Sequence, residues 1–216
     1  MFREFTSNEI LFLIGAVRWT VGLTAVAFIG GGILGLLIML MRVSRSRIVS
    51  TVAIFYIQLV QGTPLLGQLF LFYFGLGLVG WRVDPWLAAS VALILNSAAF
   101  LAEIWRGCVQ SIPRAQWEGS ASLSLSFLQQ IRYVILPQAV RIAIPPTVGY
   151  LVQVIKSTSL ASVIGFVELT RAGQIINAAT FRPFLVYLLV GAMYFVLCFP
   201  LTVAGRRLES RLHVAR

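Results

Sequence analysis

The fold of this chain is decided by one stretch, residues 113–137, which reads PRAQWEGSASLSLSFLQQIRYVILP. It is a polar, serine-rich segment between two hydrophobic runs, and its apolar residues Trp117, Ala121 and Leu125 recur at helical spacing. One face of such a helix can lie on apolar protein or lipid. The other face consists of small residues that let a second protein come close. We therefore expect a short transverse helix over residues 114–128 on which a partner docks.

The composition indicates a membrane protein. The 216 residues are 59% hydrophobic and only 11% charged, with a mean hydropathy of +0.91. These values lie outside the range of soluble domains. Since a helix needs about 20 apolar residues to cross a bilayer, the sequence predicts an all-α membrane protein with a single transmembrane domain. The chain, residues 1–216, would cross the membrane at about 16–41, 49–79, 86–107, 138–166 and 184–205.

The net charge of +10 is explained by membrane topology and not by nucleic-acid binding. Cytosolic loops of membrane proteins hold an excess of Lys and Arg. Most of the 17 basic residues here follow the first and last predicted spans or surround the serine-rich stretch, which predicts an external N-terminus and a cytosolic C-terminus. These residues are Arg42, Arg45, Arg47, Arg106, Arg114, Arg132, Arg141, Arg206, Arg207, Arg211 and Arg216.

The sequence offers no motif for metal binding or catalysis. Cys108 and Cys198 have no CxxC or Cys/His spacing, and His213 is the only histidine. A phosphate-binding P-loop needs Gly directly before its Lys, whereas Ile155 precedes Lys156. HExxH, GxSxG and paired intramembrane carboxylates are absent from the sequence. We expect a transport component without catalytic residues, metal or cofactor in this chain.

The second predicted span has a polar interruption. Residues 58–68 read QLVQGTPLLGQ, and Pro64 removes a backbone donor while Gly62 loosens the turn before it. We expect a kink or break near the middle of the membrane. Gln61 and Thr63 can face a substrate path there, or they can simply cap the broken helix.

Other features of the spans are best explained by packing. Asn96 and Glu103 lie seven residues apart on one helix face. We expect Glu103 to pair with Arg106 at i+3, and Asn96 either to hold helices together, which we favour, or to line a cavity. The first span has glycines that indicate close helix approach, namely Gly30, Gly31, Gly32 and Gly35.

Lys156 is the only lysine of the protein and lies within a span. An ionised side chain there is costly unless it is paired or faces water. We favour the interpretation that Lys156 borders a polar translocation cavity together with Ser157, Thr158 and Ser159. The alternatives are that it snorkels toward the membrane surface or pairs with Glu168.

The serine-rich stretch resembles the cytosolic loop of permease subunits in bacterial ATP-binding-cassette importers. In that superfamily the loop reads Glu-Ala-Ala, three residues, Gly, nine residues, Ile, any residue, Leu-Pro. The spacing is the same here, while several identities change to other small or apolar residues. The corresponding positions are Glu118, Gly119, Ser120, Ser124, Val134, Leu136 and Pro137.

Further stretches resemble the polar amino-acid (histidine/glutamine) type of these permeases: QGTPLLGQLFLFYFGL at 61–76, AEIWRGCVQSIPRAQWE at 102–118, ILPQAVRIAIPP at 135–146 and KSTSLAS at 156–162. The resemblance implies a type I importer permease fold of about five helices in the bacterial inner membrane, with a periplasmic N-terminus. It also implies that the predicted transverse helix is a coupling helix that contacts an ATPase. The coupling residues would be Gln116, Trp117, Glu118, Gly119, Ser120, Ser124, Leu136 and Pro137.

The same resemblance implies the partners and the substrate. They are a second permease chain, identical or paralogous, two copies of a cytosolic ATPase that hold ATP and Mg, a periplasmic solute-binding protein, and an amino acid. Five helices are too few to enclose a pathway, so two permease chains should surround it. The outer mouth would include residues 80–85 and 168–183. The substrate site that we expect near the bilayer midplane consists of Gln61, Gln68, Asn96, Lys156, Ser157 and Thr158.

Two other classes of function remain as alternatives. A secondary transporter or channel subunit for a small polar solute would use Lys156 and Glu103 to relay protons or ions without an ATPase. A structural membrane scaffold is disfavoured, because it gives no reason for a broken polar span and a buried lysine.

Overall fold

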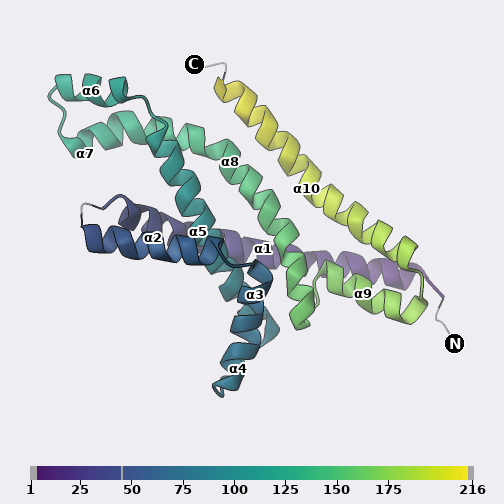
Figure 1. The fold of residues 1–216 in the computed structure, drawn as a ribbon. Helices are drawn as coiled ribbons and strands as arrows, with labels where there is room; N and C mark the ends of the chain where they lie inside the picture. Colours follow the sequence, from purple (N-terminus) through teal and green to yellow (C-terminus); the bar gives the residue numbers. More distant parts are fainter. Residues whose placement is uncertain (1–3, 45, 214–216) are drawn as a thin grey trace.

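The computed structural model describes residues 4–44 and 46–213, which form helices joined by short connections (Figure 1). The all-α fold class predicted from the sequence is confirmed. A π-helical segment, Leu71–Gly75, joins α3 to α4, another, Gln130–Ile135, joins α7 to α8, and a 3-10 helix, Thr158–Ile164, follows α8. The α-helices are α1 Ser7–Arg42, α2 Arg47–Gln61, α3 Leu65–Phe70, α4 Leu76–Leu78, α5 Pro85–Gln110, α6 Arg114–Ser122, α7 Phe127–Gln129, α8 Leu136–Ser157, α9 Leu169–Thr180 and α10 Pro183–His213.

Four helical segments of the described chain are long and apolar enough to cross a membrane, and a bent pair of helices makes a fifth if the pair is one span. The four continuous segments contain α1, α5, α8 and α10. The pair consists of Arg47–Gln61 and Leu65–Leu78, bent by 99°. Each predicted span falls on one of these segments, and the predicted break lies where the bend occurs, at residues 62–64. The orientation of the spans across a membrane stays a prediction.

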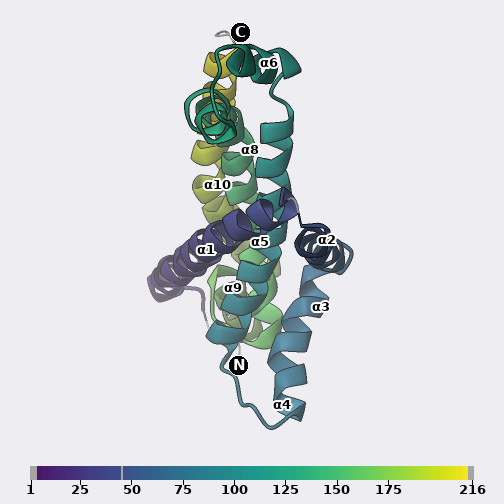
Figure 2. The same ribbon diagram turned by 90° about the vertical axis from the view of Figure 1, so that its left-hand side faces the viewer.

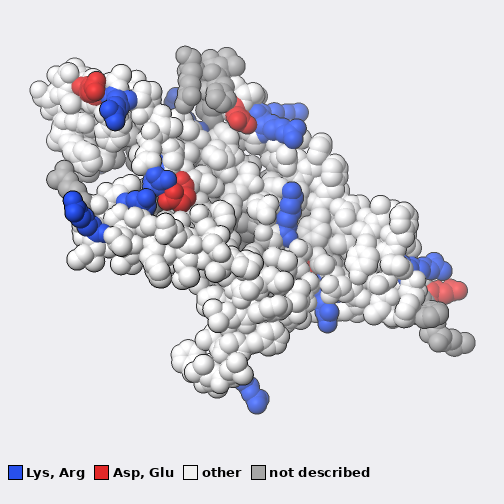
Figure 3. All heavy atoms as spheres, in the orientation of Figure 1, with Lys and Arg blue, Asp and Glu red and all other residues white. Residues whose placement is uncertain are grey.

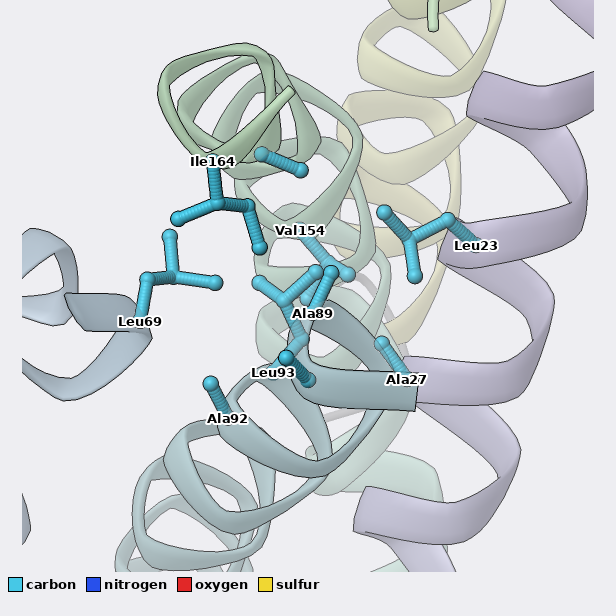
Figure 4. Packing of buried hydrophobic residues seen from close by; sticks show 10 residues of the cluster. Leu23, Ala27, Leu69, Ala89, Ala92, Leu93, Val154 and Ile164 are labelled. Carbon is cyan, nitrogen blue, oxygen red and sulfur yellow. The ribbon is translucent and has the colours of Figure 1, made fainter. Parts of the chain in front are cut away.

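Helix α5 forms the centre of the bundle and packs against α1, α2, α3 and α8. Its buried face is rich in alanine, and Leu23 and Ala27 of α1, Leu69 of α3 and Val154 of α8 converge on it (Figure 4). Small side chains on both helices let α1 and α5 approach closely.

The glycines of α1 show how close this approach is. A Cβ added at Gly31 would lie 2.4 Å from Cβ of Ser97, and one at Gly35 would lie 2.9 Å from the carbonyl oxygen of Ala98. Gly30 is similarly tight, against Ile94. The predicted role in helix packing is confirmed for these three, whereas a Cβ at Gly32 would make only an ordinary contact with the Trp105 ring at 3.7 Å.

The two ends of the molecule differ in content. Helix α6 and the C-terminal end of α10 lie at one end, and α4, α9 and the N-terminal end of α1 lie toward the other (Figures 1 and 2). Charged side chains gather mainly at the periphery of the face shown, and a few basic side chains lie on the otherwise uncharged surface between them (Figure 3). This distribution matches a protein whose middle lies in lipid.

Helix α9 has no counterpart among the elements expected from the sequence, which assigned residues 168–183 to an outer mouth. It begins at Leu169 because the Glu168 carboxylate accepts hydrogen bonds from the N–H groups of Thr170 (2.9 Å) and Arg171 (2.8 Å). Its apolar face packs with α1 and α10. A helix of 12 residues is too short to have been recognised as a span.

Candidate coupling helix and polar path

The serine-rich stretch forms a shorter helix than predicted. Helix α6 ends at Ser122, whereas the sequence predicted a helix over 114–128. Ser124 adopts a left-handed backbone conformation, φ 57°, and its N–H bonds to the carbonyl of Ala121 (2.9 Å) while that of Leu125 reaches Ser120 (3.4 Å). This is the Schellman arrangement that ends helices, usually with glycine at the left-handed position. Trp117 and Ala121 therefore lie within α6, whereas Leu125, which continues their spacing, lies beyond the end of the helix.

Helix α6 lies on the protein through one face and exposes the other. Trp117 packs on a cluster formed by Ile112, Ile135 and Ala139, and it stacks on Phe127 with ring centroids 6.4 Å apart. Ser120 is buried, and its hydroxyl donates to the carbonyl of Trp117 (2.8 Å).

The other predicted coupling residues lie mostly on the surface. Glu118 and Gly119 are exposed, and a Cβ added at Gly119 meets no atom within 4 Å. The free face of α6 is therefore open to a partner. Gln116 accepts a hydrogen bond from the Gln138 side chain (3.2 Å), which ties α6 to the start of α8. Ser124, Leu136 and Pro137 are also exposed.

Three predicted substrate residues meet at the break between α2 and α3. The Gln68 side-chain amide donates to the carbonyl of Val60 (2.8 Å) and to the hydroxyl of Thr63 (2.9 Å). Asn96 of α5 donates to the Gln68 side-chain oxygen (3.4 Å). Gln61 donates to the carbonyl of Ala99 in α5 (3.4 Å). The Gln68 bond to Val60 satisfies a backbone carbonyl that the break leaves free. The bonds of Gln61 and Asn96 join the break to α5.

The other three predicted substrate residues lie elsewhere, where α8 passes into its 3-10 extension. Thr158 is fully buried, and its hydroxyl donates to the carbonyl of Ile155 (2.7 Å). Ser157 is half-buried, and Lys156 is exposed beside α10. The structure thus brings the six residues together as two groups of three on different helices.

The alternative pairing of Lys156 with Glu168 is wrong within the described residues. The fully buried Glu168 carboxylate is held by α9 backbone N–H groups and by the Tyr194 hydroxyl of α10, which donates at 2.7 Å. No ion pair joins it to Lys156 among residues 4–44 and 46–210. Tyr194 was not identified from the sequence, because nothing in an apolar run indicates which tyrosine meets a distant acid.

The predicted pairing of Glu103 with Arg106 is confirmed. The Arg106 Nε lies 2.9 Å from Oε1 and 3.0 Å from Oε2 of Glu103. Arg42, at the end of α1, adds a longer ion pair of 3.8 Å to the same carboxylate. Its participation was missed because α1 and α5 are brought side by side only in the fold. The cluster joins the end of α1 to the part of α5 that leads into α6.

Four continuous apolar helical segments, a bent pair of helices that makes a fifth if it is one span, and an exposed short helix at one end are typical of a multi-pass helical membrane protein. The chain belongs to the family described as binding-protein-dependent transport system inner membrane component, whose model matches residues 14–214. This confirms the permease resemblance and the inner-membrane location predicted from the sequence.

Curated relatives and solved structures agree with this assignment. The chain is 38% identical over 204 residues to the glutamine transport system permease protein GlnP of Escherichia coli K12, covering 94% of this chain and 93% of that one. It is 36% identical over 200 residues to a probable amino-acid ABC transporter permease, YckA of Bacillus subtilis, covering 93% and 88%. The structure matches a chain from a crystal structure of an amino acid ABC transporter with histidines, at a TM-score of 0.92 and 35% identity, over 98% of this chain and 100% of that one.

Proposed function

We propose that this chain is the permease subunit of an ATP-driven importer of a polar amino acid, and that it forms half of the translocation pathway. Membership of the inner-membrane component family and the amino-acid transporters among its relatives support this proposal. The observation that supports it most directly within the chain is the exposed face of α6 around Glu118 and Gly119. A separate ATPase would dock on this face and drive transport through the conformational change that ATP binding and hydrolysis cause.

Two copies of a cytosolic ATPase, which would hold ATP and Mg, are the proposed partners of α6 and its counterpart. Closure of the ATPase pair on ATP would move the two coupling helices together and rock the permease halves between inward-facing and outward-facing states. The Gln116 to Gln138 bond joins α6 to α8, and the Glu103 cluster joins α1 to the part of α5 that leads into α6. A displacement of α6 would therefore be passed to the spans through these contacts.

A second permease chain, identical or paralogous, would cover the break between α2 and α3. Residues 61–64 are exposed in the isolated chain, although they lie in the middle of a span. Irregular backbone is not tolerated against lipid, and it occurs within membranes only beside protein or a water-filled cavity. A periplasmic solute-binding protein would deliver the amino acid at the opposite end from α6.

The substrate site is proposed to include Gln61, Gln68 and Asn96 at the break and Lys156, Ser157 and Thr158 on α8. The Lys156 ammonium group would bind the α-carboxylate. Replacement of Lys156 by Met should then weaken uptake of the transported amino acid, measured in proteoliposomes that contain the permease, the ATPase and the binding protein. Unchanged affinity and rate would remove Lys156 from the pathway.

The proposed function is tested by reconstitution of the complete importer in proteoliposomes with a panel of radiolabelled polar amino acids: glutamine, histidine, arginine and cystine. We expect uptake of at least one of them that requires ATP and the binding protein and is inhibited by vanadate. Uptake driven by a proton gradient without the ATPase would instead identify a secondary transporter.

A further inference from the structure

A groove runs along the contact between α8 and α10, away from the break. It consists of two adjoining hollows of about 400 and 370 Å³. Lys156, Thr202 and Arg206 line both hollows. Apolar side chains of α10, among them Phe195 and Phe199, form much of the remaining wall. Two cationic side chains thus lie in one groove whose walls are otherwise largely apolar.

The neutral polar groups of the groove are already used within the protein. The Thr202 hydroxyl donates to the carbonyl of Cys198 (2.9 Å), and the Tyr194 hydroxyl donates to Glu168. The charged side chains of Lys156 and Arg206, by contrast, make no hydrogen bond or ion pair with any described residue. Glu209 lines the groove one turn beyond Arg206 and is not paired with it. The two cations are therefore the donors that remain for a ligand.

The positions of the two cations give the groove a direction. Lys156 lies beside Cys198, and Arg206 lies eight residues further along α10, about 12 Å at the rise of an α-helix, so that both side chains reach the same hollows. The far end of α10 lies at the end of the molecule that contains α6 (Figure 1). The groove therefore leads from the level of Lys156 toward the end at which the ATPase is proposed to bind.

We infer that Lys156 and Arg206 are two successive binding positions for the α-carboxylate of the transported amino acid, and that Arg206 receives it on the way to the cytosol. This inference rests on the proposed function. An anion offsets the cost of an unpaired cation within a span. Conduction also requires sites that are weak and multiple, so that a ligand bound at one position can leave for the next. A single lysine would hold the carboxylate in place, whereas a second cation gives it a next position to occupy.

The chain offers a matched control for this inference. Arg207 is adjacent to Arg206 on the same helix and lines a different hollow, with Phe199, Pro200 and Leu208. Arg206→Gln and Arg207→Gln remove the same charge from the same turn of α10. If the arginines served only as topogenic charges, the two variants would behave alike.

The experiment measures ATP-dependent uptake by the complete importer in proteoliposomes, with the panel amino acid that the wild type transports best. We expect Arg206→Gln to lower the uptake rate about tenfold, as for loss of one charged hydrogen bond, and Arg207→Gln to leave it near wild type. Arg206→Lys should retain most of the activity, because it keeps the charge. Co-purification with the ATPase checks that every variant assembles.

Three results would overturn the inference. One is an equal effect of Arg206→Gln and Arg207→Gln, and another is wild-type uptake by Arg206→Gln. The third is a loss in Arg206→Gln that disappears when anionic lipid is omitted from the vesicles, which would assign Arg206 to a lipid phosphate. If the wild-type complex shows no ATP-driven uptake of any panel amino acid, the proposed function itself fails, and the carboxylate path fails with it.

Discussion

At the scale of single residues, Ser124 shows how one backbone angle sets the length of a functional element. Its φ of 57° ends α6. A side chain in that region is strained, whereas glycine is not. The superfamily motif described above has glycine at this position, and the geometry explains that choice without reference to the partner. Spacing alone did not reveal the helix end, because serine is tolerated in both a helix and a turn.

We therefore predict that Ser124→Gly stabilises the protein by about 1 kcal/mol, because glycine relieves the strain. The matched control is Ala121→Gly, on an exposed position inside α6, which should destabilise it by about 1 kcal/mol because helical glycine loses more backbone entropy. Thermal unfolding in detergent measures both. If the two glycine variants shift the midpoint in the same direction, the helix-ending role of Ser124 is wrong.

Glu168 gives a second prediction at this scale. Burial raises the pKa of its carboxyl, and the hydrogen bonds from Thr170, Tyr194 and Arg171 lower it without cancelling that effect. The folded state therefore holds the proton more tightly than the unfolded state. The stability contributed by this group is complete below the ordinary glutamate pKa and is lost as the pH rises through the raised value.

The measurement is the unfolding midpoint from about pH 4 to pH 8, a range that begins near the ordinary glutamate pKa. We expect the midpoint of the wild type to fall more with rising pH than that of Glu168→Gln, whose side chain has the same shape and does not titrate. Parallel pH profiles for the two proteins would show that Glu168 titrates as it does in the unfolded chain.

At the scale of helices, α1 and α5 pack closely because glycines of α1 have no side chain at the points where the two helices meet. The Cβ that Gly31 lacks would lie 2.4 Å from the Ser97 Cβ and 3.2 Å from the Ala98 backbone nitrogen, whereas at Gly32 it would make an ordinary contact. Gly31→Ala should therefore destabilise the protein by about 1–3 kcal/mol through overpacking. Gly32→Ala should be neutral or stabilise it by up to about 1 kcal/mol. Midpoints of thermal unfolding that fall equally in both variants would rule out this close approach.

At the break between α2 and α3, the interruption of the helix could be predicted from the sequence, but the hydrogen-bond partners of its polar side chains could not. Pro64 and Gly62 could be read from the sequence as a break, because proline lacks the N–H that a continuous helix requires. The partners of Gln61 and Gln68 could not be read, because the groups that they bond belong to the other side of the break and to α5. A polar residue within a span indicates that a partner exists, and only the packing identifies it.

At the scale of the whole molecule, α6 is the part of the surface that the proposed assembly requires to be free. Gly119 is exposed and a Cβ added there meets no atom within 4 Å, so the side chain of Gly119→Trp can extend into solvent from the surface of α6. We predict that this variant and Glu118→Lys insert into the membrane normally and lower uptake about tenfold or more, because a bulky or reversed group at an interface centre disrupts docking. ATP hydrolysis in these variants should no longer respond to the substrate-loaded binding protein.

The control for this prediction is Gly15→Trp, which also places a large side chain in open space but on α1. ATPase activity and amino-acid uptake are measured in the same proteoliposomes. Normal uptake and normally stimulated hydrolysis in Gly119→Trp would show that α6 does not dock the ATPase.

An all-α, multi-pass membrane protein with one broken helix could be predicted from the amino-acid sequence, because these features follow from the length of apolar runs and from the break that proline imposes along one chain. The Glu103 to Arg106 pair could be predicted as well, because it is local to one helix face. Three contacts became known from the packing of the helices alone: Tyr194 donates to Glu168, Arg42 joins the Glu103 cluster, and Lys156 lies in a groove with Arg206. These contacts join residues far apart in the chain, and their energies depend on which helix faces meet, a property that no local pattern of residues contains.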